Sequence, residues 1–150
     1  MSTRTYNAKN VHITLVSPIL GAITLRGFAK DSMVTISRDN PAYEKKEGVD
    51  GETTRSRVNA KGGKVKIYLD QASPSNDDLE KLADLDELSD TGIAAFQLVE
   101  TGSKATDRSA SAWIEKKPDN GYALASGDRE WTLDTGLLEH IVGGRTDSVG

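Results

Sequence analysis

Alternation of apolar and polar side chains in short runs constrains this chain more than any other feature. In "KVKIYLD" (64–70), apolar residues take the odd positions, while lysine or tyrosine takes the even ones up to 68. Similar runs predict further strands at 11–16, 22–28, 33–38, 94–100, 109–116 and 129–134. The C-terminal "LLEHIVGG" (137–144) is predicted as a strand that ends at its glycines. Glycine, proline or asparagine separates the runs, so we expect a mainly β protein, a sandwich or barrel.

The segment "SPSNDDLEKLADLDELSD" (73–90) departs from this pattern. Four leucines recur at three-residue spacing: Leu79, Leu82, Leu85 and Leu88. We predict one flanking α-helix at about 76–88 that packs these leucines on the sheet, with Ser75 or Asn76 as the N-cap.

Size and composition fit one soluble domain over 1–150, with a short mobile tail at about 145–150. Aromatic residues are only 5% of the chain, so we expect Phe28, Phe96, Trp113 and Trp131 to anchor the core. Without cysteine there are no disulfides or thiolate sites, as is usual in the cytoplasm. The sequence shows neither a cleavable signal nor an apolar run of ~18 residues, so no membrane anchoring is expected.

Residue patterns for catalysis or metal binding are weak. His12 and His140 lack a second ligand at a recognised local spacing, and no G-x-S-x-G motif occurs. The carboxylates of 77–90 fit a solvated helix surface better than an acid/base pair. We therefore predict that the chain is not an enzyme and has no metal site and no cofactor.

The stretch "GVDGETTRSRVNAKGG" (48–63) combines glycines with basic residues, as phosphate sites do. A P-loop needs a helix after its glycines, whereas strands are predicted here. We interpret 53–57 and 64–68 as a hairpin that turns at Gly62-Gly63, with basic residues on both strands and an undetermined register. No aromatic residue alternates with these basic residues, and the net charge is -4, which disfavours a nucleic-acid groove. The preferred partner is an acidic surface, with 77–90 a candidate in the same subunit or a neighbour.

Three segments carry a family resemblance: "GVDGETTRSR" (48–57), "GKVKIYLDQASPSNDDLEKL" (63–82) and "REWTLDTGLLEHIVGG" (129–144). They resemble the tail tube proteins of contractile-tailed bacteriophages. The match runs in order over most of the chain and is weakest at 101–128. The resemblance implies a β-sandwich or barrel whose long hairpin or loop, about 39–63 here, reaches an adjacent ring.

The resemblance also implies an assembly. Hexameric rings would stack into a hollow tube, inside a contractile sheath, that delivers DNA. Implied partners are further copies of the chain, the tail sheath, baseplate and tail terminator proteins, the tape measure protein and genomic DNA in the lumen. The protein would be made in the host bacterial cytoplasm and reside in the virion. The expected inter-subunit or inter-ring contacts are Tyr43, Asp50, Glu52, Arg55, Arg57, Lys64, Lys66, Asp77, Asp78 and Glu80.

Since a DNA conduit must not grip its cargo, the basic residues of this set are expected at interfaces and the lumen is expected to be neutral or negative. Two alternatives stay open. One is the tube of a type VI secretion apparatus or of a phage-like bacteriocin. The other is a soluble ligand-binding β module that uses exposed aromatic residues such as Trp113 or Trp131.

Overall fold

The computed structural model describes residues 7–29, 33–101 and 105–143, and the predicted mobile tail at 145–150 lies outside them. A short 3-10 helix, Ala8–Asn10, precedes the first strand. The strands are β1 (Val11–Ser17), β2 (Gly21–Thr24), β3 (Val34–Arg38), β4 (Tyr43–Glu47), β5 (Thr53–Arg57), β6 (Gly63–Asp70), β7 (Ala94–Glu100), β8 (Thr106–Lys116), β9 (Asp128–Thr135) and β10 (Glu139–Ile141). One α-helix, α1 (Ser75–Ser89), lies between β6 and β7.

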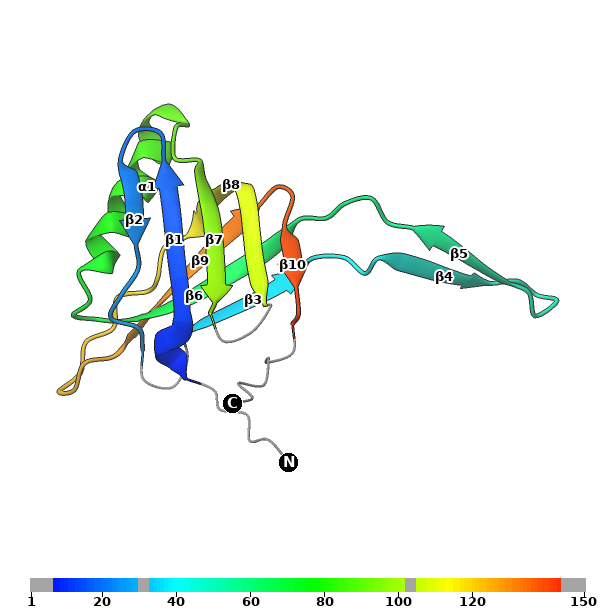
Figure 1. The fold of residues 1–150 in the computed structure, drawn as a ribbon, viewed down its shortest axis with the longest axis horizontal. Helices are drawn as coiled ribbons and strands as arrows, with labels where there is room; N and C mark the ends of the chain where they lie inside the picture. The colour runs from blue at the N-terminus through cyan, green and yellow to red at the C-terminus, as the bar shows by residue number, and fades with distance from the viewer. Residues whose placement is uncertain (1–6, 30–32, 102–104, 144–150) are drawn as a thin grey trace, which may run out of the picture.

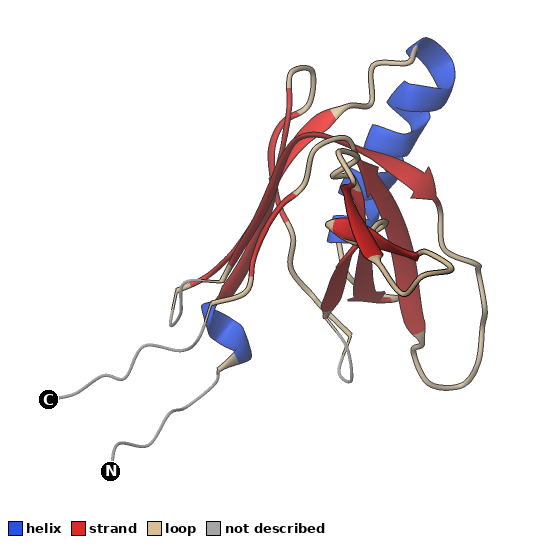
Figure 2. Ribbon diagram, turned by 90° about the vertical axis from the view of Figure 1, so that its right-hand side faces the viewer, coloured by secondary structure: helices blue, strands red, loops and turns tan. Residues whose placement is uncertain are grey.

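Eight strands form one antiparallel sheet in the order β2-β1-β7-β8-β9-β6-β3, with β10 also paired to β8. Strand β8 divides this sheet, because its first half pairs with β10 and its second half with β9. The two halves lie face to face in Figure 2, and α1 lies at one end of the body in Figure 1. The predicted mainly β sandwich or barrel with one helix is confirmed.

Apolar side chains from both halves of the sheet and from α1 form one core. Every second residue of β6 is buried, as its alternation predicts. Phe96 and Trp131 are buried anchors, and Phe28 packs against the core while half-buried. Trp113 differs from the prediction: it is half-buried and pairs in register with Asp134, away from the core.

The helix begins without the predicted side-chain cap. Pro74 takes the N-cap position, while the Ser75 hydroxyl accepts the Arg26 backbone N–H at 2.9 Å. Asn76 donates to the Asp70 carbonyl and accepts the Trp131 indole N–H at 2.8 Å. Ser75 thus joins α1 to the segment after β2, and Asn76 joins it to β6 and β9, instead of capping the helix.

The leucines of α1 do not share one face. Leu79 and Leu82 are fully buried, Leu85 is half-buried and Leu88 is 85% exposed. Each three-residue step falls about 60° short of a full turn, so three steps carry Leu88 to the opposite side of the helix from Leu79. The predicted packing of all four leucines is therefore wrong for Leu88.

Candidate assembly interface

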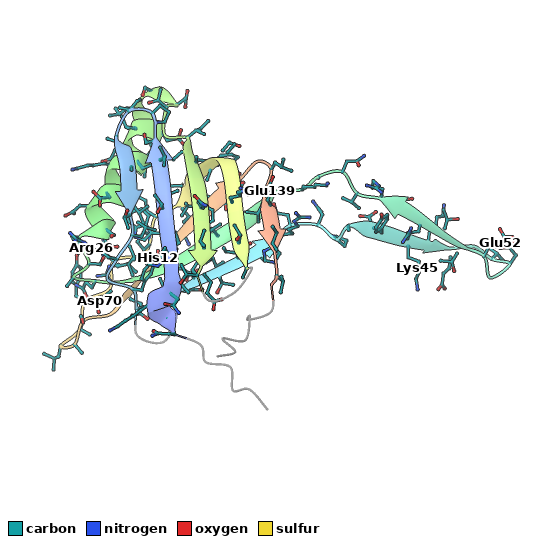
Figure 3. All side chains as sticks on the ribbon, viewed as in Figure 1. His12, Arg26, Lys45, Glu52, Asp70 and Glu139 are labelled. Atoms are coloured by element: carbon teal, nitrogen blue, oxygen red, sulfur yellow. The ribbon has the colours of Figure 1, made fainter. Side chains whose placement is uncertain are left out.

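A long β-ribbon, defined here as Tyr43–Arg57, projects from one end of the body (Figure 1). Its strands β4 and β5 form a separate two-stranded sheet, and every residue of both strands is exposed. Figure 3 shows Lys45 and Glu52 far from the body, with Glu52 at the tip. The predicted projecting hairpin at about 39–63 is confirmed. An isolated ribbon is marginally stable in water, so its length and exposure favour a partner surface.

The register of the ribbon gathers basic and aromatic side chains on one face. Tyr43 pairs with Arg57, and Lys45 pairs with Arg55. The Arg55 guanidinium lies 4.1 Å from the Tyr43 ring centroid, and Arg57 donates to the Tyr43 hydroxyl at 3.2 Å. We call Tyr43, Lys45, Arg55 and Arg57 the cationic face of the ribbon. Tyr43 was among the expected contacts, but its place beside the arginines was not predicted, because it precedes them by more than ten residues in the sequence.

The tip of the ribbon is acidic and carries one fully exposed apolar side chain. Its turn closes with the Gly48 N–H donating to the Glu52 carbonyl at 2.7 Å, and Gly51 has φ 85°, which favours glycine. Asp50 and Glu52 lie at this turn, and Val49 between them and the strand is fully exposed. Charge therefore changes along the ribbon, from basic near the body to acidic at the tip.

The base of the ribbon is tied to the turn that follows β9. The Leu138 N–H donates to the Lys61 carbonyl at 2.9 Å, and Arg38 donates to the Leu138 carbonyl at 2.8 Å. A Cβ on Gly63 would lie 2.5 Å from both Leu138 Cδ2 and the Ser37 carbonyl oxygen. Close packing thus requires glycine at position 63. Arg38 before the ribbon and Lys61 after it both bond Leu138, so the chain is anchored to the body on both sides of the ribbon.

The predicted hairpin of 53–57 with 64–68 is wrong. Strand β5 pairs with β4, whereas β6 pairs with β3 and β9. Lys64 and Lys66 consequently lie on the body, where they contact Glu115 at 2.6 Å and Glu130 at 3.7 Å. The hydrogen bond with Glu115 raises the pKa of Lys64. The predicted basic residues thus form two separate groups.

Within the subunit, the acidic surface of α1 pairs with Lys117 and not with the basic residues of 53–66 that were its predicted partners. Lys117 contacts Glu80 at 2.8 Å and Asp84 at 3.1 Å, and these hydrogen bonds raise the pKa of Lys117. Among the ion pairs of residues 7–29, 33–101 and 105–143, none joins 77–90 to the ribbon, Lys64 or Lys66. Asp77 and Asp78 lie in the first turn of α1, where the helix dipole favours them.

Lys117→Gln is expected to lower the urea midpoint of the free subunit slightly at neutral pH and low salt. The folded pKa of Lys117 is raised above 10.5, so its contribution is complete below that value and is lost at higher pH. The difference in urea midpoint between Lys117→Gln and wild type should therefore stay constant from about pH 7 to about pH 9. It should become smaller in high salt. Lys116→Gln is the control, and an equal effect of both changes would contradict the assignment.

Titratable side chains and one polar cleft lie on the body, away from the ribbon. In the described part of the chain, no three His, Cys, Asp or Glu side chains gather as a metal site would require. His140 pairs with Asp107 between β10 and β8. A polar cleft of 640 Å³ lies between α1 and 117–131, where Trp131 is buried and Tyr122 is exposed. Within the same described residues, α1 is too short and too polar to cross a membrane.

Solved structures define the class of this fold. A sheath/tube terminator of the PVC extracellular contractile injection system, in its extended state, superposes with a TM-score of 0.61 at 12% identity, over 93% of this chain and 99% of that one. The tail of an empty gene transfer agent particle with C6 symmetry superposes with a TM-score of 0.58 at 12% identity, over 92% of this chain and 100% of that one. The fold is that of tail and injection-system tube components.

Sequence comparison gives the family. The family model of the bacteriophage PhiTE tail tube protein matches residues 1–143, and this chain belongs to that family. A curated relative is structural protein ORF10 of Pseudomonas phage KPP10, which is 28% identical over 134 residues, 87% of this chain and 78% of that protein. The predicted resemblance to phage tail tube proteins is confirmed.

Proposed function

We propose that this chain is the repeating subunit of a phage tail tube, with all 150 residues forming one domain. Six copies form a ring, and rings stack into a hollow conduit through which DNA passes inside a contractile sheath. The observation that carries the proposal is the β4–β5 ribbon, which extends from one end of the body with every strand residue exposed. Membership of a structural tube family favours a role without catalysis.

Ring formation is supported by the edges of the sheet. Strands β2 and β3 end the strand order, and β10 has β8 as its pairing partner. Unpaired strand edges are satisfied when a sheet continues into the next copy around a closed ring. The C6 symmetry of the gene transfer agent tail, which has a similar fold, supports six copies.

Ring stacking is assigned to the ribbon. Its cationic face would meet carboxylates on a subunit of the adjacent ring, with Asp77, Asp78 and Glu80 on α1 as candidates. These lie on the helix, at the end of the body opposite the ribbon (Figure 1), so a head-to-tail stack would bring the two surfaces together. The acidic tip, with Asp50 and Glu52, would contact the same neighbour farther along. Lys64 and Lys66, already paired within the body, would lie at a subunit interface.

The proposed partners follow from this assembly. The sheath and the tail terminator protein are supported by the similar fold of a sheath/tube terminator. The baseplate proteins, the tape measure protein and the genomic DNA complete the proposal. The subunit would be made in the bacterial cytoplasm and function in the virion.

Negative-stain electron microscopy of the purified protein tests the function. We expect rings, or tubes with a hollow centre, that lengthen as the protein concentration increases. Size-exclusion chromatography with light scattering gives the mass of the smallest assembly, which should be six subunits. A strictly monomeric protein at high concentration and at every salt concentration would contradict the proposal and favour a ligand-binding β module.

A second candidate is the tube of a phage-like bacteriocin, a type VI secretion system or another injection apparatus that carries no genome. The similarity to a contractile injection system component supports it. Genes for a capsid and for DNA packaging beside the gene of this chain would favour the phage tail, and their absence would favour the alternative.

A further inference from the structure

The two outer faces of the folded sheet differ sharply in chemistry. We define the small-residue face as the outward side chains of β2, β1, β7, the first half of β8, and β10. One row crosses all five strands in register: Thr24, Thr14, Gln97, Arg108 and Glu139. Polar but mostly uncharged side chains thus run from one edge of this face to the other.

A second row on the small-residue face is apolar and short. Ala22, Val16 and Ala95 are adjacent on β2, β1 and β7, and all three are exposed. A hollow of 380 Å³ lies over this region, with Ala110 and Leu137 among its lining residues. The hollow forms because short side chains stand where long ones would fill it.

Arg108 and Glu139 are the two formally charged side chains among the outward positions of these strands. They are direct cross-strand partners, and Arg108 Nε lies 2.5 Å from Glu139 Oε2. Their side chains are 59% and 51% exposed, so the pair contributes little to stability. Its effect is local neutrality, because the Glu139 carboxylate lies directly beside the Arg108 guanidinium. Figure 3 shows Glu139 on β10, with His12 on the same front sheet.

The opposite outer face, on β3, β6, β9 and the second half of β8, carries charges of both signs. Lys64 pairs in register with Asp134, and Lys66 with Thr132. Lys116 on β8 pairs in register with Thr132, and Glu130 contacts Lys66. Cations on this face are numerous and spread across the sheet, unlike the single paired arginine on the small-residue face.

We propose that the small-residue face is the surface that faces the DNA in the bore, and that Glu139 masks Arg108 so that the bore does not hold the polyanion. This inference rests on the proposed tube. Every residue recurs six times in a ring and again in each stacked ring, so one unmasked arginine gives a dense array of phosphate contacts. Such contacts sum, and the affinity they give falls steeply with salt.

The test uses assembled tubes and a short fluorescent DNA duplex, with binding measured by co-sedimentation between about 50 and about 200 mM salt. Glu139→Gln should bind DNA at least about tenfold more tightly than wild type, with a steeper dependence on salt. Arg108→Gln/Glu139→Gln, which removes both charges, should return to the wild-type level. DNA held in the bore should also resist nuclease.

Matched variants place the effect on one face. Gln97→Lys adds a cation without a partner to the row that contains Arg108 and Glu139, and it leaves the Arg108–Glu139 ion pair unchanged. It therefore tests the face if Glu139→Gln does not form tubes. Its control is Thr132→Lys on the opposite face, and Glu130→Gln is the control for Glu139→Gln. DNA bound by either control should remain sensitive to nuclease.

Each result bears on the inference separately from the function. Protected, salt-dependent binding by Glu139→Gln supports both parts of the inference, and the same result for Gln97→Lys supports the assignment of the face. Glu139→Gln tubes that bind no more DNA than wild-type tubes would overturn the masking role. Bound DNA that nuclease digests would overturn the assignment of the face. If wild-type protein forms no tubes, the proposed function itself fails.

Discussion

A subunit in which two glycines replace the ribbon Tyr43–Arg57 will fold normally and form no tubes. Ala42 and Val58 border this segment, and the Val58 N–H already donates to the Ala42 carbonyl at 2.9 Å, so a two-residue turn can close there. This replacement leaves the contacts of Lys61, Gly62 and Gly63 with the body intact. A longer deletion, of 41–62, would remove Lys61 and Gly62 and their contacts. Since the ribbon residues are exposed, subunit stability should change by less than about 0.5 kcal/mol.

Assembly should be lost because, in the proposed tube, the ribbon contacts would be repeated around each ring junction. Six contacts of about 0.5 kcal/mol each sum to about 3 kcal/mol, so tubes should be absent even about a hundredfold above the wild-type assembly concentration. Electron microscopy and sedimentation measure tubes, and thermal unfolding measures the subunit. Rings that persist without stacking would place the ribbon between rings. Tubes of normal length would remove the ribbon from the stacking interface.

A charge reversal separates the cationic face from the ribbon backbone. Arg55→Glu/Arg57→Glu keeps the two strands but inverts the charge beside Tyr43, so stacking should weaken strongly. Thr54→Glu/Ser56→Glu adds the same number of carboxylates to the other ribbon face, since these residues pair with Lys46 and Glu44. Equal losses from both variants would show that the cationic face has no special role.

Leu138→Ala is expected to give the largest loss of stability in the free subunit. Leu138 is fully buried and packs against Gly63 at the base of the ribbon. Truncation of a buried leucine costs about 2–5 kcal/mol, which corresponds to a decrease in Tm of about 5–15 °C for a domain of this size. The measurement is urea unfolding at fixed protein concentration.

The neighbouring residue gives a matched control for this prediction. Leu137 is 57% exposed, so Leu137→Ala should change the unfolding free energy by less than about 0.5 kcal/mol. Similar losses from the two alanines would contradict the packing at the base of the ribbon.

Sequence alternation was sufficient for most strands of the main sheet, although the strand predicted at 22–28 ends at Thr24 in the structure. Strand β7 begins and ends where 94–100 was predicted, and β6, β8 and β9 differ from prediction by a few residues at their ends. These strands are buried on one face, so burial imposes the two-residue period that the sequence displays. The predicted strand at 137–144 contracts to β10, because Leu138 turns into the core before that strand begins.

The ribbon shows where alternation fails. Strand β4 reads "YEKKE", with no apolar period, because neither of its faces is buried in the subunit. Alternation therefore indicated β6 as the partner of β5, with the glycines at 62–63 as the turn. Those glycines are needed for close packing against Leu138 and the β9–β10 turn, which no local pattern predicts. The actual turn lies at Gly48–Glu52.

Because the ribbon leaves the body at one end only, a stack of these subunits would be a polar filament. One terminus would expose six free ribbons, and the other would expose six unfilled acceptor surfaces, so the two could not be closed by the same protein. Addition at the two termini would also differ in rate, since an incoming ring must order its own ribbons at one terminus and meets ribbons already in place at the other. Elongation should therefore proceed mainly in one direction. A capping protein that mimics only the acceptor surface, or only the ribbon, would bind one terminus and stop elongation there.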